Sequence, residues 1–307
     1  MTGFIVRRIL AMIPLLIIVS IFVFSIMQLA GGNAALVIGG TDATQEELAQ
    51  ITERYGLNRP MHEQYRTWLT NAVQGDLGQS LLTRRPVTEE IRTRILPTAE
   101  LAFTAMAIAL LVGVLMGIMS ARRPNSLIDN ICMLFSFIGV AMPVFGIGLA
   151  LIYFLGVHLG WLPTGGAGGL RYLVLPAITL SVSSIAILAR MTRSSTLDVI
   201  RHDYVRTARA KGLAEGPVFR GHVLRNGLIP VITVVGLEFG SLLSGAVITE
   251  TVFSRPGIGR LLVEGIRSRD YPVVQGVLLL LAVVCVTVNL IVDIVYMLVD
   301  PRIQGVG

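Results

Sequence analysis

The chain has 307 residues, of which 53% are hydrophobic and only 14% are charged, and its mean hydropathy is +0.74. A soluble globular domain carries about 25% charged residues. Apolar runs of about 18 residues or more recur here, so the composition excludes an ordinary soluble domain and indicates a polytopic helical membrane protein. The formal net charge of +6 is therefore weighed first against the bilayer, and no nucleic-acid partner is expected.

The first predicted span covers residues 9–30. Its apolar run of about 22 residues exceeds the roughly 7–15 residues of a signal-peptide core, so residues 1–30 predict a retained transmembrane helix. Residues 31–96 form a polar insert. Within it, Thr44 and Glu47 fit a capping box that opens an amphipathic helix, and Pro60 suits the start of a second helix carrying Tyr65 and Trp68. We therefore expect a small folded helical cap.

Five further apolar stretches predict spans. Prolines fall at or near the starts of four of them, where a missing N–H costs little; these are Pro97, Pro176, Pro230 and Pro272. Six spans place both ends of the chain on one side of the membrane. The five later spans cover residues 98–120, 130–156, 173–190, 229–250 and 273–298, within a core of residues 97–300 that precedes a tail of residues 301–307.

The basic residues predict the orientation. With the N-terminus inside, short cytoplasmic segments hold 13 Lys and Arg, and short outer segments hold 5. The 31–96 insert is too long to weigh heavily in this rule. We therefore expect both termini in the cytoplasm, a cytoplasmic loop over residues 191–228, and an extracytoplasmic cap.

The cytoplasmic loop contains the densest run of arginine. From residue 196 to residue 211, Leu197, Ile200, Tyr204 and Ala208 recur at helical spacing, which predicts one helix along the membrane surface, closed by Gly212. Pro217 would open a second short helix. Two interpretations stay open on these grounds: an interfacial helix whose arginines meet anionic lipid, or a knob that docks a cytoplasmic partner.

The segment "YVRTARAKGLAEGPVFRGHVLRN" resembles the cytoplasmic loop of bacterial ABC importer permeases, whose pattern is Glu-Ala-Ala, three residues, then Gly. Gly212 matches the glycine, Ala208 the second alanine and Leu224 a distal leucine, while Arg206 and Thr207 replace Glu-Ala. "NRPMHEQYRTWL", "GDLGQS", "ETVFSRPGIGRLL" and "YMLVDPR" agree. The chain thus resembles the dipeptide/oligopeptide-type permease subunits over essentially its whole length.

The resemblance implies a type I ABC importer permease of six helices in a bacterial cytoplasmic membrane. It implies a second permease subunit, two ATPase subunits or domains that bind ATP and Mg, and an extracytoplasmic substrate-binding protein. The sole lysine, Lys211, lies in no Gly-Lys-Ser/Thr step, so the chain has no P-loop. We therefore expect no catalytic residue, cofactor or metal in this subunit. The implied ATPase-coupling residues are Tyr204, Arg206, Ala208, Arg209, Gly212, Leu213, Ala214, Glu215, Gly216, Phe219, Arg220 and Leu224.

Polar residues inside predicted spans are candidates for the substrate pathway, because they are costly in lipid. Small residues near Glu238 also fit close helix packing, which is the commoner use of such spacing. Asn289 shares a face with Asp293, which favours hydrogen bonding between helices. "SRPGIGR" after the fifth span suggests a tight outer turn more than an anion site. The pathway candidates are Glu238, Ser241, Ser244, Glu250 and Asn289.

Two other classes of protein compete with an ABC permease. An ion-driven secondary transporter would favour internal repeats and midplane carboxylates, of which one central glutamate is thin support. A membrane enzyme would need a nucleophile or metal constellation within the spans, and none is seen in the sequence. Within the ABC class, the sequence leaves dipeptides, oligopeptides, glutathione, nickel complexes and haem open as substrates. It also leaves open whether the insert of residues 31–96 receives the binding protein or covers the outer vestibule as a lid.

Overall fold

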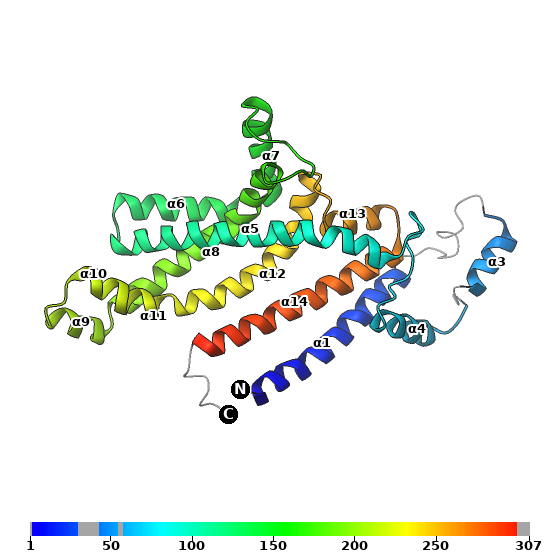
Figure 1. Cartoon of the computed structure of the whole chain (residues 1–307), viewed down its shortest axis with the longest axis horizontal. Coiled ribbons are helices and arrows are strands. Elements are labelled where there is room, and N and C mark those ends of the chain that lie inside the picture. The colour runs from blue at the N-terminus through cyan, green and yellow to red at the C-terminus, as the bar shows by residue number, and fades with distance from the viewer. Residues whose placement is uncertain (1, 30–42, 55–57, 300–307) are drawn as a thin grey trace. The chain divides into compact units, whose positions relative to one another are not determined.

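A computed structural model describes residues 2–29, 43–54 and 58–299 of the chain (Figure 1). Within these residues every regular element is helical, and the only β-type contact is an isolated bridge between Gln79 and Pro86. Among them, five helices are long and apolar enough to cross a membrane, or six if one bent pair counts as a span. An all-helical membrane protein is therefore confirmed. The predicted end of the first span, Ala30, and the tail of residues 301–307 lie outside the described part.

One compact unit comprises residues 1–96 and 257–286. Its apolar core joins the start of α5, at Val87 and Ile91, to Leu261 of α13 and Val277 of α14. The aromatic rings of Tyr65 and Trp68 on α4 contact Phe24 of α1. The helices of this unit are α1 (Thr2–Leu29), α3 (Gln45–Arg54), α4 (Met61–Val73), the first part of α5 (Val87–Arg122), α13 (Ile258–Arg267) and the first part of α14 (Tyr271–Val299).

The predicted capping box of α3 is confirmed. The backbone N–H of Thr44 donates to Glu47 Oε2 at 2.9 Å, and the N–H of Glu47 donates to Thr44 Oγ1 at 3.3 Å. The same backbone and hydroxyl donors of Thr44 lower the pKa of Glu47. Two of the N–H groups that a helix start leaves unpaired are thus satisfied locally.

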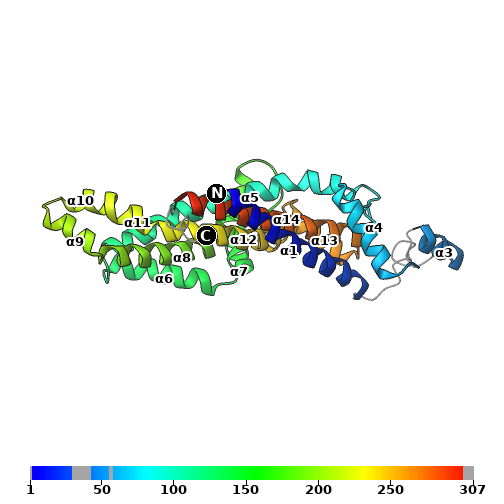
Figure 2. The ribbon, with the colours of Figure 1, turned by 90° about the horizontal axis from the view of Figure 1, so that it is seen from below.

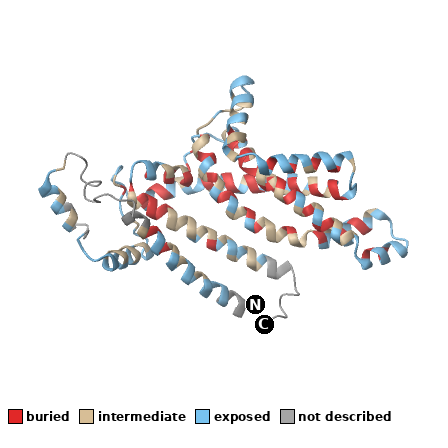
Figure 3. Cartoon of the chain, turned by 180° about the vertical axis from the view of Figure 1, so that it is seen from behind, coloured by how far each residue is buried: buried red, intermediate tan, exposed pale blue. Residues whose placement is uncertain are grey.

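The second unit comprises residues 97–256 and 287–307, and α8 (Arg171–Ile200) is its central helix. Figures 1 and 2 both show α6 (Leu127–Ala141) running beside α8. The second part of α5 and α12 (Ile229–Val252) complete an apolar core that includes Leu101, Leu180 and Leu242. Figure 3 shows buried residues along much of α8.

Small residues allow α5 to approach α8 closely. A Cβ placed on Gly117 would lie 2.5 Å from the Cβ of Thr192, and one on Gly113 would lie 2.8 Å from the carbonyl oxygen of Ile185. These distances are far below van der Waals contact, so neither site accepts a side chain. Packing through small residues is the usual way in which helices associate in lipid, where apolar burial gives little drive.

The third predicted span is not one straight helix. It consists of α6, α7 (Val144–Leu151) and the π-helix η1 (Ile152–His158), and its two halves meet at 106°. The break falls at Met142-Pro143, where Met142 is extended with φ −83° and ψ 133°. Proline lacks an N–H and forces the preceding residue out of the helical region, which explains the bend.

Other helix bounds also differ from prediction. Pro97 and Pro176 lie inside α5 and α8, because these helices begin at Val87 and Arg171, ten and five residues before the prolines. Membrane helices tolerate such internal prolines. The amphipathic helix α13 was not predicted at all; it follows directly after "SRPG", where Gly257 is its N-cap.

Candidate coupling site

The predicted cytoplasmic loop folds as a hairpin of short helices within the second unit. Figure 1 shows α9 (Asp203–Ala210), α10 (Glu215–Val218) and α11 (Arg225–Gly227) grouped together, with the π-helix η2 (Phe219–Leu224) between the last two. We call residues 203–224 the coupling hairpin. The prediction of one helix over residues 196–211 is wrong, because α8 runs through Ile200 and the chain turns before α9 begins.

The coupling hairpin has an apolar core of its own. Val205 and Ala208 from α9 pack with Val218, Phe219 and Val223 from the second arm, and all five are buried. The small size of Ala208 therefore serves packing inside the hairpin. Since buried apolar groups hold the two arms together, the hairpin is stiffer than a loop of the same length would be.

The hairpin is also tied to the end of α5. The guanidinium carbon of Arg122 lies 5.1 Å from the centre of the Phe219 ring, which is within the range of a cation–π interaction. Phe219 thus packs inside the hairpin on one side and against the last residue of a spanning helix on another. A displacement of the hairpin would reach α5 directly through this contact.

The turn between the arms needs glycine for its backbone conformation. Gly212 has φ +81°, which side-chain-bearing residues rarely adopt, and its N–H donates to the carbonyl of Arg209 at 2.9 Å. No atom lies within 4 Å of a Cβ placed there, so the outer side of Gly212 is open. Across the turn, the Nε of Arg209 donates to Glu215 Oε1 at 2.7 Å and closes the hairpin.

The other predicted coupling residues divide by exposure. Tyr204 and Leu213 are 42% and 48% exposed, and Asn226 donates to the Tyr204 hydroxyl at 3.1 Å. Arg206 lies 3.8 Å from Asp203 in a fully solvated pair, which contributes little to stability. The remaining predicted residues are exposed at Ala214 and Arg220 and intermediate at Gly216 and Leu224.

A buried ion pair was missed near the C-terminal ends of α5 and α8 and the start of α6. Arg193 donates from Nε and Nη2 to the two oxygens of Asp129, both at 2.7 Å, and Asp129 also accepts from Ser120 and from the N–H of Asn125. Asp129 is 2% exposed. A bidentate pair of this kind fixes the relative position of α6 and α8. In sequence, Arg193 was counted only as a loop charge.

The carboxylates among the pathway candidates lie between helices. Ser184 donates to Glu238 Oε2 at 2.6 Å, joining α8 to α12, and Thr98 donates to Glu250 Oε1 at 2.5 Å, joining α5 to α12. Both glutamates are buried within the chain, at 7% and 0% exposure. Ser241 and Ser244 of α12 and Asn289 of α14 are exposed. A pathway role for these five residues stays a prediction.

The turn after α12 places an arginine that the sequence did not single out. Arg255 is 4% exposed; its Nη2 donates to Glu100 Oε2 at 2.9 Å and its Nε to the carbonyl of Pro97 at 3.3 Å. Ser254, just before it, has φ +50°. Because Glu100 neutralises this guanidinium, the turn fastens α12 to α5.

Comparisons with known proteins agree with this arrangement. The family described as "Binding-protein-dependent transport system inner membrane component" matches residues 113–305, and its N-terminal companion matches residues 1–102. The glutathione transport system permease proteins GsiC of Escherichia coli O6:H1 and Salmonella typhimurium are each 42% identical over 304 residues, covering 99% of both chains.

Solved structures give the same fold. A structure of the MetNI methionine ABC transporter in an inward-facing conformation has a TM-score of 0.59 at 17% identity, covering 69% of this chain and 96% of the other. An amino acid ABC transporter crystallised with histidines has a TM-score of 0.52 at 18% identity, covering 70% and 94%. The chain therefore belongs to the inner membrane components of binding-protein-dependent transport systems, and it is a multi-pass ABC importer permease subunit of type I architecture.

Proposed function

We propose that this permease, together with a second permease subunit, forms the membrane pathway of an ATP-driven importer for short peptides. Glutathione, a tripeptide, is the leading candidate within that class. Two partner ATPase subunits bind ATP and Mg and supply the work, and an extracytoplasmic binding protein delivers the substrate. The sequence resemblance implied dipeptides or oligopeptides, and the relatives are named for glutathione. Both point to short peptides as the substrate class.

The coupling hairpin is the observation that carries the proposal. Work from a separate ATPase can reach the spans only through an element that does not deform when it is pushed. The buried core around Val205 and Phe219, the Arg209–Glu215 closure and the Arg122 contact with Phe219 make such an element. Arg206 and Arg220 are exposed on the hairpin and the space around Gly212 is open, which together suit an acidic groove on the ATPase.

The relatives support the substrate class. Identity of 42% extends over 99% of both chains, so it includes the spans as well as the hairpin. The exposed candidates Ser241, Ser244 and Asn289 are neutral hydrogen-bonding side chains, which suit peptide groups. Nickel complexes and haem remain alternatives of the same architecture.

The excess of Lys and Arg in short loops supports the orientation, with 13 on the hairpin side and 5 on the other. In this orientation the hairpin and both termini are cytoplasmic. The insert of residues 31–96 is then extracytoplasmic, on the side from which a binding protein would approach.

The decisive test compares Gly212→Asp with Gly212→Asn in the assembled complex. The two side chains have the same shape and both tolerate positive φ, so only the charge differs. We expect both complexes to assemble, while Gly212→Asp hydrolyses ATP without transporting peptide. Normal transport by Gly212→Asp in a normally assembled complex would overturn the docking role.

A second experiment separates the classes of transporter. Deleting residues 213–221 should abolish co-purification with the ATPase subunit while the permease still inserts. If instead the purified chain alone accumulates peptide in vesicles under an ion gradient, it is a secondary transporter. The ligand retained by the partner binding protein, identified by native mass spectrometry, would settle the substrate; a tripeptide is expected, and a nickel or haem complex would contradict the peptide assignment.

A further inference from the structure

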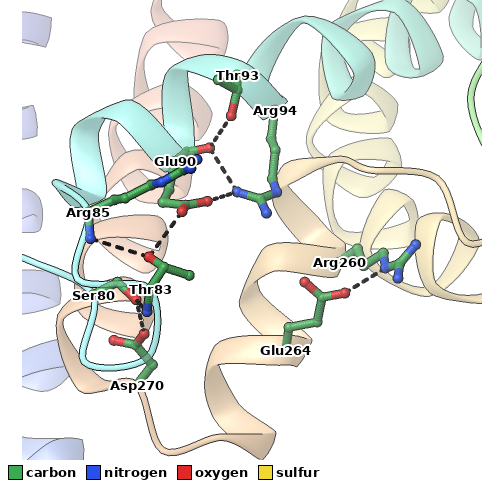
Figure 4. A network of polar contacts seen from close by, with 9 residues as sticks. All are labelled: Ser80, Thr83, Arg85, Glu90, Thr93, Arg94, Arg260, Glu264 and Asp270. Carbon is green, nitrogen blue, oxygen red and sulfur yellow. Dashed lines mark hydrogen bonds and ion pairs between the residues drawn. The ribbon is translucent and has the colours of Figure 1, made fainter. Parts of the chain in front are cut away.

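A second basic surface lies in the first unit, outside the candidate spans' apolar stretches. It consists of the turn formed by residues 80–86, which we call the Ser80 turn, and of residues 267–270, which are the end of α13 and the short link to α14 (Figure 4). The two segments are nearly 190 residues apart in the chain, yet Ser80 and Asp270 are in direct contact.

Asp270 holds the Ser80 turn in place. Its carboxylate accepts from the Ser80 hydroxyl at 2.5 Å, from the N–H of Leu81 at 3.1 Å and from the N–H of Leu82 at 3.3 Å. Asp270 is only 3% exposed. Hydrogen bonds to a charged acceptor are stronger than neutral ones, so three of them fix the turn.

The turn is braced from its other side as well. The N–H of Ser80 donates to the carbonyl of Arg85 at 2.9 Å, closing the base of the turn. Thr83 donates to Glu90 Oε1 at 3.1 Å, and Glu90 is paired with Arg94 on the next turn of α5, as Figure 4 shows. The backbone of the turn is therefore held in one conformation from both sides.

Two arginines of this surface have strained backbones. Arg84 has φ +61° and Arg269, directly before Asp270, has φ +55°. This left-handed region is unfavourable for a non-glycine residue and is found where the surrounding structure over-determines the conformation, often at functional sites. At a turn with no need for a side chain, glycine would avoid the strain.

Most arginines of this surface lack an acidic partner. Of the carboxylates on the adjoining helices, Glu90 and Glu264 are paired with Arg94 and Arg260, Glu89 is exposed, and Asp270 accepts hydrogen bonds from the Ser80 turn. Within the described residues, three exposed arginines form no ion pair, namely Arg84, Arg267 and Arg269, while exposed Arg85 interacts with Glu90 through charge alone. Leu82, in the Ser80 turn, is 71% exposed.

We propose that the Ser80 turn and residues 267–269 form a docking surface for an acidic face of the extracytoplasmic substrate-binding protein. The inference rests on the proposed function and its orientation, which places both segments outside. Positive charge that no internal carboxylate neutralises attracts an acidic surface and speeds its approach. Because the turn is already ordered, docking loses little conformational entropy.

A lipid headgroup explains these features less well. Attraction of basic residues to anionic lipid needs no fixed backbone, and the strongly anionic leaflet is the cytoplasmic one. Here each of the two segments holds one arginine in a fixed left-handed conformation, and a fixed geometry suits recognition of a partner with a defined shape. The protein face is therefore the occupant that the structure favours.

The test measures binding of the purified binding protein to the complete complex in nanodiscs, by biolayer interferometry. The double variant Arg84→Glu/Arg269→Glu reverses two unpaired charges, and Arg66→Glu is the matched control, because Arg66 is exposed on α4 of the same unit. We expect the double variant to weaken binding at least about tenfold and to flatten its salt dependence, with Arg66→Glu within about twofold of wild type.

Arg84→Gly and Arg269→Gly remove the side chains while relieving the strain, so they test the surface without endangering the fold. Weaker binding by these variants supports the proposal. Unchanged binding by all the arginine variants would overturn it, as would an effect seen only when the nanodiscs contain phosphatidylglycerol. If the complex assembles with its ATPases but the variants bind the binding protein as wild type does, this inference alone fails. If no ATPase assembles with the permease, the proposed function fails.

Discussion

The coupling hairpin and the Ser80 turn are both exposed segments with a fixed backbone, but different interactions fix them. Both present exposed arginines, and each reverses the chain through a residue with positive φ, Gly212 in the hairpin and Arg84 in the turn. The hairpin has two helical arms and buries five apolar side chains between them. The Ser80 turn has no such arms, and a buried carboxylate, Asp270, holds it instead.

This difference shows that an exposed segment can be made rigid either by an apolar core or by hydrogen bonds. An element with two helical arms can bury enough apolar surface to hold its own shape, whereas a single turn has almost no interior and depends on directed hydrogen bonds. The first device resists a push from any direction, which suits transmission of force. The second fixes the positions of a few charged groups, which suits recognition.

The largest expected effect comes from removing the hairpin core. Phe219→Ala deletes a buried ring and the Arg122 contact, at a cost of roughly 3 kcal/mol. Amide hydrogen exchange over residues 203–224 should then accelerate about 100-fold. Leu213→Ala, at an exposed position, is the control and should change exchange little. Unaltered protection in Phe219→Ala would mean that the hairpin is not held by its own core.

Removing the carboxylate is the corresponding test of the Ser80 turn. Asp270→Ala leaves the Ser80 hydroxyl and two backbone N–H groups without their acceptor, at a cost of about 2 kcal/mol. Exchange of the Leu81 and Leu82 amides should accelerate while the hairpin stays protected. Asp270→Asn keeps an acceptor oxygen, so its loss of stability should be about half that of Asp270→Ala. Equal effects in hairpin and turn would break the comparison.

Gly212 and Arg84 both have positive φ, so adding a side chain at the first and removing one at the second should change stability in opposite directions. Gly212→Ala introduces strain of about 1 kcal/mol, whereas Arg84→Gly relieves strain and should range from neutral to about 1 kcal/mol stabilising. Gly221→Ala is the control, because Gly221 has no positive φ and open space around its Cβ position. Thermal unfolding of the purified permease measures all three. A destabilising Arg84→Gly would show that the arginine is not strained.

The smallest expected effect is at the Arg209–Glu215 closure. Both side chains are largely solvated, so Arg209→Gln should cost only about 0.5 kcal/mol, and less at high salt. Unfolding midpoints in low and high salt check this. A loss of more than about 2 kcal/mol would show that the hairpin depends on an ion pair, as the Ser80 turn does.

The parts of the fold that depend on local patterns could be predicted from sequence. Apolar length identified the spans, and the Thr44–Glu47 spacing identified a capping box that the structure confirms. Local patterns also existed for two features that were missed. Pro143 in "AMPVF" signals the bend in the third span, and "IGRLLVEGIR" has the spacing of the amphipathic helix α13.

The contacts that define the sites join residues far apart in the chain, and local patterns do not predict them. Arg193 and Asp129 are 64 residues apart, Arg255 and Glu100 are 155 apart, and Asp270 is 190 residues from Ser80. No local spacing links such pairs, because they form only when helices from distant segments pack. The arginine run of the hairpin was found in the sequence and the resemblance gave it a docking role, while the arginines of the Ser80 turn needed the structure.

The central claim is that the coupling hairpin receives the work of a separate ATPase, and cross-linking tests it most directly. A photo-reactive amino acid at Leu213 in the active, assembled complex should cross-link to the ATPase subunit, with a yield that changes when ATP binds. The same probe at Leu82, on the Ser80 turn, should give no ATPase product. An ATPase adduct from Leu82, or none from Leu213 in a complex that still transports, would contradict the account.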